Sequence, residues 1–324
     1  MTHAIVIDQN GGPEVMRWSE VAVGRPGPGQ ALIRHTAIGV NFIDVYMRKG
    51  VYKAPGFPLI NGQEGAGVVE AVGDGVTLVK PGDRVVYQGQ LGAYAEERLV
   101  SADKLVKIPA GVDDVTAAAS FLKGLTAWML LRKTFLVEKG NAILFHAAAG
   151  GVGVIACQWA KALGATVIGT VGSDDKAAAA RANGCDHVIN YRKEDFAKRV
   201  REITGGEGVA VAYDSVGKDT FPGSLDSLAQ RGMWVSFGQS SGVPPEFPIS
   251  ALQFRGSLFA TRPVVSHYVA KRPDLEAGAA ELFGVIASGA VKLANPRTVP
   301  LKDAAEAHRA VEARETVGST VLIP

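Results

Sequence analysis

The sequence predicts an α/β protein in which a parallel sheet covered by helices is inserted into a β-rich domain. Two observations carry this prediction: strand-like and helix-like segments alternate through the middle of the chain, and short strand-like runs between glycine and proline turns fill residues 1–120. Alternating strands and helices are typical of a parallel sheet, whereas short, regularly spaced strands are typical of a barrel or sandwich. A chain of 324 residues is long enough for both domains.

The most informative segment is residues 146–153, HAAAGGVG, which follows the apolar run Ala142–Phe145 and precedes a helical pattern. In the fingerprint G-x-G-x-x-G, the middle glycine lets the backbone approach a pyrophosphate and the last lets the helix pack on the strand. Gly150 and Gly153 occupy these two places, and Ala148 occupies the first. We expect Ala148 to make the turn with ordinary backbone torsions. The segment therefore predicts a dinucleotide site.

The alternation continues after this motif. Apolar and β-branched runs predict further strands, and spacing of apolar residues predicts helices between them. The strands are expected at 165–171, 187–190, 208–213 and 233–237, and the helices at 152–163, 177–183 and 194–203. This order is that of a dinucleotide-binding Rossmann domain with helices on both faces of its sheet.

Both ends of the chain are expected to contribute to one β-barrel. Strand-like runs at 31–40, 67–72 and 83–87 come first, and the last 60 residues add a helical stripe ended by Gly289, a capping-box pattern at Asp303 and Glu306, and a closing strand at 318–323. We therefore expect a discontinuous domain of residues 1–124 and 260–324, with the dinucleotide domain, residues 125–259, inserted between them.

Charge and composition exclude several other functions. The 34 Lys and Arg residues are dispersed among 32 Asp and Glu, for a net charge of +2, so no nucleic-acid partner is indicated. The uncharged stretch after Lys139 is interrupted by glycines and polar residues, which excludes a membrane span. Residues 1–8 show no signal peptide, and Cys157 and Cys185 form no C-x-x-C pair. We expect a cytoplasmic protein with buried thiols.

Motifs along the whole chain resemble those of the medium-chain dehydrogenase/reductase superfamily, and within it the quinone oxidoreductase branch. The resemblance rests on AIGVNFID at 37–44, AASFLKGLT at 118–126, the glycine motif, YDSVG at 213–217, VSFG at 235–238, ASG at 287–289 and the C-terminal strand at 318–324. It implies a GroES-like β-barrel catalytic domain with an inserted Rossmann NADPH-binding domain. It also implies a homodimer, for which 256–260 is interpreted as an exposed edge strand in need of a partner.

Zinc alcohol dehydrogenases of the same superfamily use a cysteine and a Gly-His-Glu motif as metal ligands. Here Asn41 stands at the cysteine position and the motif is Gly62-Gln63-Glu64, which removes the thiolate and the imidazole that zinc prefers. We expect neither catalytic nor structural metal. Because no zinc would acidify an alcohol, the acceptor is expected to be activated already, as quinones and enones are, with the hydride supplied by the cofactor.

The resemblance assigns the reaction to Asn41, Asp44, Tyr46, Tyr52 and Gln239. Among these, Tyr52 and Asn41 are expected to donate hydrogen bonds to the quinone oxygen that gains charge. Each residue also has a purely structural explanation, since the tyrosines can be packing residues, Asn41 a turn residue and Asp44 a helix cap. His146 is expected to be structural, as a buried neutral imidazole that satisfies nearby backbone groups.

NADPH is expected because of the residues after the second strand of the sheet. NAD-selective enzymes place an acid there to hold the ribose, but Val171 is followed by Gly172 and Ser173. We prefer to interpret Asp174 and Asp175 as helix-start residues rather than ribose ligands. The resemblance pairs Lys176 with Tyr191 around the 2′-phosphate, with Ser173 as a donor. It implies further cofactor contacts at Asn41, Phe42, Lys123, Thr126, Ala149, Gly150, Gly151, Val152, Ser215, Phe237, Gly238, Gln239, Ser240, Phe259, Arg262 and Arg314.

The expected function is that of a zinc-independent NADPH:quinone oxidoreductase, in which a hydride passes from NADPH to a quinone held between the domains. Two alternatives stay open. One is an NADPH-dependent reductase of α,β-unsaturated carbonyls or enoyl thioesters on the same scaffold. The other is an NADPH-binding protein with little turnover.

Overall fold

The structure, a computed structural model, describes residues 1–293 and 295–324 and divides into two compact units. The first unit comprises Met1–Lys123, Lys271–Phe283 and Leu293–Pro324, and the second comprises Gly124–Ala270 and Gly284–Lys292. The predicted boundary after Phe259 is wrong, because it cuts β14 (Phe259–Thr261), which pairs with β13 (Leu228–Ser236) in the sheet of the second unit. Among the described residues, no helix has both the length and the apolar character needed to cross a bilayer.

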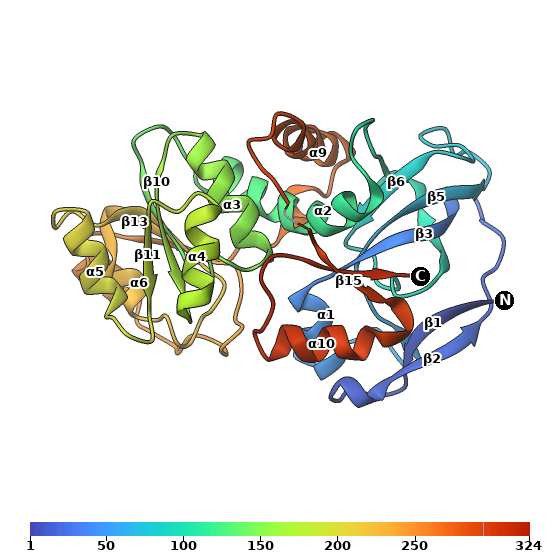
Figure 1. Cartoon of the computed structure of the whole chain (residues 1–324), viewed down its shortest axis with the longest axis horizontal. Helices are drawn as coiled ribbons and strands as arrows, with labels where there is room; N and C mark the ends of the chain where they lie inside the picture. Colours follow the sequence, from blue (N-terminus) through green and yellow to red (C-terminus); the bar gives the residue numbers. More distant parts are fainter. Residues whose placement is uncertain (294) are drawn as a thin grey trace. The chain divides into compact units, whose positions relative to one another are not determined.

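The second unit contains one six-stranded parallel sheet in the order β11-β10-β9-β12-β13-β14 (Figure 1). Its strand order runs outward from β9 in both directions, which creates the switch point at which such sheets bind dinucleotides. Helices α3 and α4 pack on β10, α5 packs on β11, and α6 packs on β12 and β13. The bounds are β9 Ala142–Phe145, β10 Thr166–Val171, β11 His187–Asn190, β12 Val209–Asp214, α3 Gly151–Ala162, α4 Asp174–Ala182, α5 Phe196–Ile203, α6 Gly223–Asp226, α7 Ser250–Phe254 and α8 Val265–Tyr268.

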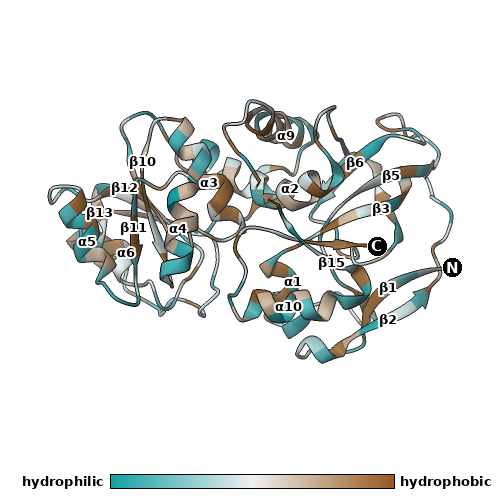
Figure 2. Cartoon of the chain, viewed as in Figure 1, coloured by the Kyte–Doolittle hydropathy of each residue, from teal (hydrophilic) through white to brown (hydrophobic). Residues whose placement is uncertain are grey.

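Most elements of this sheet were expected from the sequence, with two informative differences. β13 begins at Leu228, earlier than expected, because Leu228 already pairs with Val209 before a register shift. Helix α4 begins at Asp174 rather than at residue 177, since both aspartates lie in its first turn, where a helix favours negative charge. Figure 2 shows hydrophilic residues on α4 and α5, whereas the mostly buried α3 is largely hydrophobic.

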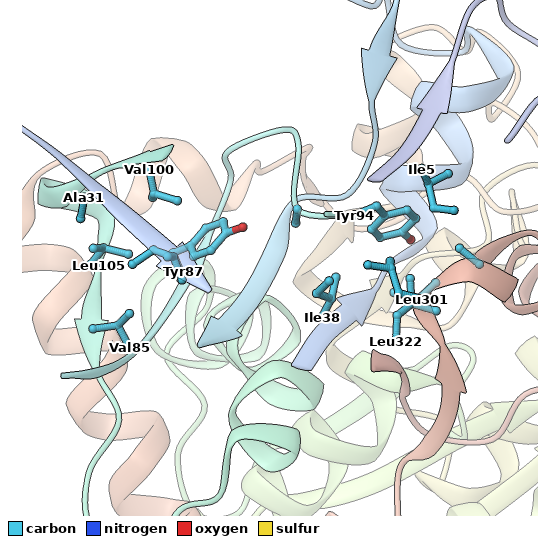
Figure 3. Close-up of a cluster of buried hydrophobic side chains, with 14 of the residues drawn as sticks. Ile5, Ala31, Ile38, Val85, Tyr87, Tyr94, Val100, Leu105, Leu301 and Leu322 are labelled. Carbon is cyan, nitrogen blue, oxygen red and sulfur yellow. The ribbon is translucent and has the colours of Figure 1, made fainter. Parts of the chain in front are cut away.

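The first unit contains two sheets around one hydrophobic core. A three-stranded sheet has the order β2-β1-β4, and a larger sheet has the order β15-β16-β3-β5-β6-β8, with β7 also paired to β3. Side chains of both sheets and of the C-terminal segment meet in the core (Figure 3). The bounds are β1 Thr2–Ile7, β2 Met16–Val21, β3 Gln30–Val40, β4 Leu59–Ile60, β5 Glu64–Val72, β6 Arg84–Gln88, β7 Glu97–Ser101, β8 Val106–Lys107, β15 Arg297–Pro300, β16 Thr320–Ile323, α1 Phe42–Lys49 and α10 Ala304–Glu312. Helices α2 (Asp114–Trp128) and α9 (Arg272–Ala287) each run past a unit boundary.

Two local predictions need correction. Asp303 precedes α10 but makes no side-chain capping bond, because its φ of −99° and ψ of 21° lie outside the extended region that capping requires; Glu306 pairs instead with Arg297. The segment 256–260 is not an exposed edge strand throughout. Strand β14 is the edge, but Leu258 before it is buried in the core of the second unit. Both cysteines are free and buried, as expected.

Candidate active site

The turn after β9 has the geometry that the glycine motif predicts. Ala148 keeps ordinary torsions, as expected, while Ala147 takes the positive φ of 55°. A Cβ on Gly153 would stand 2.5 Å from the carbonyl oxygen of Ala147, so the last motif position must be glycine for α3 to pack here. Gly150 is the N-cap of α3, whose first N–H groups have no partner within the helix. A helix N-terminus of this kind suits a pyrophosphate.

The end of β10 brings together the residues predicted to hold the 2′-phosphate. Ser173 is the N-cap of α4, and Lys176 lies in the first turn of that helix. A Cβ on Gly172 would stand 2.7 Å from the hydroxyl oxygen of Tyr191, so the missing side chain lets Tyr191 lie over this turn.

Asp174, the first residue of α4, has partners of its own. It pairs with Lys193 at 2.6 Å and accepts a hydrogen bond from Asn190 at 2.9 Å. The ammonium group of Lys193 lowers the pKa of this carboxyl group. These contacts support the interpretation of Asp174 as a helix-start residue.

Two loops meet where β12 and β13 end. A Cβ on Gly238 would lie 2.7 Å from the carbonyl oxygen of Ser215, and Ser240 N–H donates to that same oxygen at 3.1 Å. Arg262 donates to Gln239 Oε1 at 2.8 Å. These predicted cofactor residues therefore lie together at the carboxyl ends of the strands. The amide oxygen of Gln239 is already hydrogen-bonded to Arg262. Phe237 and Ala149 lie in the adjoining loops, while Phe259 on β14 is 57% exposed.

His146 is structural, although its partners differ from those expected. Its ring is fully buried, and Nδ1 and Nε2 lie 2.9 Å from Thr170 Oγ1 and 3.1 Å from Ser224 Oγ. Burial lowers its pKa, which favours the neutral imidazole. The ring thus satisfies two hydroxyl groups rather than backbone groups.

In the first unit, Glu64 organises a buried polar cluster with Asn41 and Lys123. Asn41 Nδ2 donates to Glu64 Oε2 at 2.8 Å and to the carbonyl oxygen of Gly39 at 3.3 Å, and Lys123 Nζ lies 3.4 Å from Glu64 Oε2. The amide hydrogens of Asn41 are thus directed at protein acceptors, and the hydrogen bond from Asn41 to the quinone stays a prediction. Lys123 and Thr126 lie in the second half of α2, which begins at Asp114.

Three aromatic side chains form a row on and after α1. The rings of Phe42 and Tyr46 are 5.1 Å apart, and those of Tyr46 and Tyr52 are 5.3 Å apart, both edge to face. Tyr52 is 38% exposed at the end of the row. Such a row offers a flat substrate an apolar surface with a hydroxyl group at one end.

Asp44 is fully buried one turn into α1. Its Oδ2 accepts hydrogen bonds from Asn41 N–H at 2.9 Å and from the Tyr94 hydroxyl at 3.0 Å. Burial raises the pKa of Asp44 to about 7. The structure confirms that Asp44 caps the start of α1, and it adds a carboxyl group that can exchange a proton near neutral pH.

Sequence reasoning missed Tyr94 and His308, and it named Glu64 only as part of an altered zinc motif. No local sequence pattern identifies them, since Tyr94 contacts His308 only through the tertiary fold.

Within residues 1–293 and 295–324, no group of three or more His, Cys, Asp and Glu side chains is arranged to hold a metal ion. Arg314, a predicted cofactor contact, follows α10 in the first unit with a positive φ of 57°.

The glycine turn and the strand order define a dinucleotide-dependent dehydrogenase or reductase. Residues 27–110 match the alcohol dehydrogenase GroES-like domain, and residues 151–282 match the zinc-binding dehydrogenase family. The chain belongs to the quinone oxidoreductase branch of the medium-chain dehydrogenase/reductase superfamily.

Three relatives illustrate the match. The chain is 50% identical to quinone oxidoreductase 1 of Escherichia coli (strain K12), with 100% of both chains covered. It is 49% identical to 2-haloacrylate reductase of a Burkholderia species, with 100% of this chain and 99% of the relative covered. The crystal structure of Escherichia coli quinone oxidoreductase complexed with NADPH gives a TM-score of 0.97 at 49% identity, covering 99% of this chain and 100% of that one.

Proposed function

We propose that this protein is an NADPH:quinone oxidoreductase that works without zinc. The observation that carries the proposal is the polar cluster of the first unit, in which a lysine ammonium and an asparagine amide face Glu64. These groups are not ligands that zinc prefers. The full-length similarity to bacterial quinone oxidoreductases, one of them solved with NADPH, supports both the acceptor and the cofactor.

The reaction converts a quinone, NADPH and one proton into a hydroquinone and NADP⁺. The cofactor supplies the hydride, and conjugation in the quinone spreads the charge that the hydride delivers. The aromatic row of Phe42, Tyr46 and Tyr52 binds the flat ring, and the Tyr52 hydroxyl donates to the oxygen that becomes negative. The Lys123 ammonium group adds a positive charge in the first unit, which favours the negative charge that the quinone oxygen gains.

For the cofactor, we assign the pyrophosphate to the helix start at Gly150–Val152 and the 2′-phosphate to Lys176, Tyr191 and Ser173. Charge-assisted hydrogen bonds to phosphate are the strong ones, so Lys176 is the main source of NADPH preference. The remaining cofactor contacts are assigned as the resemblance implies them, in the first unit to Asn41, Phe42, Lys123 and Arg314, and in the second to Thr126, Ala149, Gly172, Ser215, Phe237, Gly238, Gln239, Ser240, Phe259 and Arg262.

A panel of acceptors tests this proposal. Purified protein is expected to oxidise NADPH with quinones much faster than with enones or 2-haloacrylate. The similarity to 2-haloacrylate reductase favours one second candidate, a reductase of α,β-unsaturated carbonyl compounds. Faster turnover with the enones would establish that candidate instead, and negligible NADPH oxidation across the panel would refute both.

We also propose that the protein is a cytoplasmic homodimer. The outer edge of β14 has no neighbouring strand among the described residues, and exposed apolar side chains lie on and near it, Phe259 at 57% and Phe254 at 81%. An unpaired edge of this kind favours pairing with a second copy. Free, buried cysteines are typical of proteins in a reducing compartment.

A further inference from the structure

The core of the first unit contains a chain of three buried polar side chains that the proposed reaction has not yet used. Asp44 lies on α1, Tyr94 on the segment between β6 and β7, and His308 on α10, and all three are 0% exposed. Figure 3 shows Tyr94 among aliphatic side chains of the core. Burying polar groups costs free energy unless hydrogen bonds compensate, so the hydrogen bonds among these three side chains need a physical explanation.

The hydroxyl of Tyr94 lies between two groups that can each accept a proton. Its oxygen is 3.0 Å from Asp44 Oδ2 and 3.0 Å from His308 Nε2. When Asp44 is ionised, the tyrosine hydroxyl donates to the carboxylate and the Nε2–H group of His308 donates to the hydroxyl oxygen. When Asp44 is protonated, the carboxyl group donates to the hydroxyl oxygen and the hydroxyl donates to Nε2.

These two arrangements differ by one proton. A proton taken up at Nδ1 of His308 displaces the Nε2 proton to Tyr94, and the hydroxyl proton of Tyr94 passes to Asp44. One proton thus enters at Nδ1 of His308 for each one that leaves Asp44. The starting form is restored when the Tyr94 hydroxyl turns back toward Asp44 and His308 changes from its Nδ1–H to its Nε2–H tautomer, losing one proton to water and gaining another. We propose that Asp44, Tyr94 and His308 form a proton path that re-protonates Asp44 after each reduction, with Asp44 supplying the proton that the reduced quinone takes up.

This inference rests on the proposed function, because quinone reduction by a hydride consumes one proton for each turnover. Asp44 lies on α1 with Phe42 and Tyr46 of the aromatic row, and its carboxyl group accepts a hydrogen bond from the backbone N–H of Asn41. Tyr94 and His308 act through Asp44, which makes them positioning residues rather than catalytic ones.

The far end of the path lies near a half-buried carboxylate. Glu312 follows His308 by one helical turn on α10, its side chain is 18% exposed, and it pairs with Arg48 and Lys49. Five buried polar atoms around the path have no hydrogen-bond partner in the described protein: Asp44 Oδ1, Arg48 Nε, Arg48 Nη1, Asn61 Oδ1 and His308 Nδ1. Buried polar atoms are nearly always satisfied by protein or by ordered water. We therefore expect water to link His308 Nδ1 to the solvent near Glu312.

The pKa values of Asp44, His308 and Tyr94 are consistent with transfer of a proton along this path. Burial raises the pKa of Asp44 to about 7, where the carboxyl group gains and loses a proton readily; Lys123 and Tyr94 oppose this shift and Glu64 adds to it. Burial, with a smaller effect of Arg48, lowers the pKa of His308 to about 3 against the opposing effect of Glu312. The imidazole therefore passes a proton without storing one. Burial also raises the pKa of Tyr94, so the tyrosine stays a hydroxyl group.

Replacing Tyr94 with phenylalanine removes only the central hydroxyl of the path. The same core offers a matched control in Tyr87 (Figure 3), which is also fully buried. Its hydroxyl oxygen lies 2.8 Å from Nε2 of a second buried imidazole, His35. The Tyr87 hydroxyl bonds to His35 and Arg98 rather than to Asp44, so Tyr87→Phe removes a comparable hydrogen bond without breaking the path. Thermal unfolding and NADPH binding establish that both variants are folded.

Rapid-mixing kinetics with NADPH and a quinone are expected to separate the two variants. At pH 6, Tyr94→Phe should complete its first turnover at nearly the wild-type rate, because Asp44 begins protonated. Its later turnovers should be about tenfold slower or more, with a raised solvent deuterium isotope effect, since general acid catalysis is worth about 10² or more. Tyr87→Phe should behave like the wild type. Equal behaviour of the two variants in every turnover would overturn the path.

Infrared spectroscopy tests the path without relying on an acceptor. The protonated carboxyl band that is lost in Asp44→Asn identifies Asp44, and its shift in D₂O follows exchange of its proton. Exchange should be at least about tenfold slower in Tyr94→Phe than in the wild type and Tyr87→Phe. Equal exchange rates would refute the path even in an active enzyme. An inactive wild type with slow exchange in Tyr94→Phe would instead refute only the proposed function.

Discussion

Lys176→Ala is expected to convert an NADPH-selective protein into one with little preference between NADPH and NADH. Lys176 lies in the first turn of α4, close to the N-cap Ser173 and to the turn that Tyr191 covers. A charge-assisted hydrogen bond contributes about 1.5 to 3 kcal/mol. Because each 1.4 kcal/mol is about tenfold, loss of Lys176 should raise the KM for NADPH by roughly tenfold to a hundredfold. The KM for NADH should barely change, since NADH has no 2′-phosphate.

Steady-state kinetics with both cofactors at one saturating quinone concentration measure this effect. Lys198→Ala is the control, because Lys198 is an exposed lysine of α5, so the variant loses the same charge from the same unit. It should change neither KM by more than about twofold, the range expected when long-range charge effects are screened by salt. A Lys176→Ala variant that loses affinity for both cofactors equally, or a wild type that prefers NADH, would refute the assignment of the 2′-phosphate site.

Four further predictions follow from the site and the core. Tyr52→Phe should lower kcat with quinone by up to about 10² while the Kd for NADPH stays unchanged; unchanged kcat with hydride transfer rate-limiting would make Tyr52 a packing residue. Gly153→Ala places a Cβ 2.5 Å from a backbone oxygen and should lower the free energy of unfolding by about 1–3 kcal/mol and weaken NADPH binding; a fully stable variant would contradict the close packing of α3. The wild type should lose stability relative to Asp44→Asn as pH rises from about 4 to about 7, with its free energy of unfolding falling by up to about 1.4 kcal/mol per pH unit. The reason is that the folded state keeps the Asp44 proton until pH about 7, whereas the unfolded state loses it near pH 4. A difference between the two proteins that does not change with pH would refute the raised pKa. Phe259→Lys should dissociate the dimer in sedimentation experiments, since the exposed edge would carry a charge that pairing must desolvate; a wild type that is monomeric at micromolar concentration would refute the dimer.

The nucleotide-binding half was largely predictable from the sequence because its determinants are local. The turn at Ala148, the close packing at Gly153 and the role of Asp174 as a helix-start residue each depend on residues a few positions apart. Periodicity placed the strands of the parallel sheet for the same reason. The start of β13 was missed because a register shift near Leu228 depends on the neighbouring strand rather than on its own composition.

The chemistry of the first unit was less predictable because it depends on contacts between distant residues. Family resemblance identified Asn41 and Asp44, but only the fold shows that Glu64 engages the amide of Asn41 and that burial raises the pKa of Asp44. Tyr94 and His308 are 214 positions apart, and no spacing rule connects them. The capping-box pattern at Asp303 failed because this residue is the last of a 3₁₀ turn, Leu301–Asp303, which sets its backbone torsions.

The central claim, that this chain reduces quinones with NADPH and without a metal, is tested most directly by one assay on metal-stripped protein. After exhaustive chelation, with zinc measured by elemental analysis, the initial rate of quinone-dependent NADPH oxidation is compared with that of untreated protein. We predict equal rates, less than about one zinc per ten chains, and a clear preference for NADPH over NADH. A tightly bound zinc at about one per chain, with activity lost on its removal and restored on its return, would contradict the account.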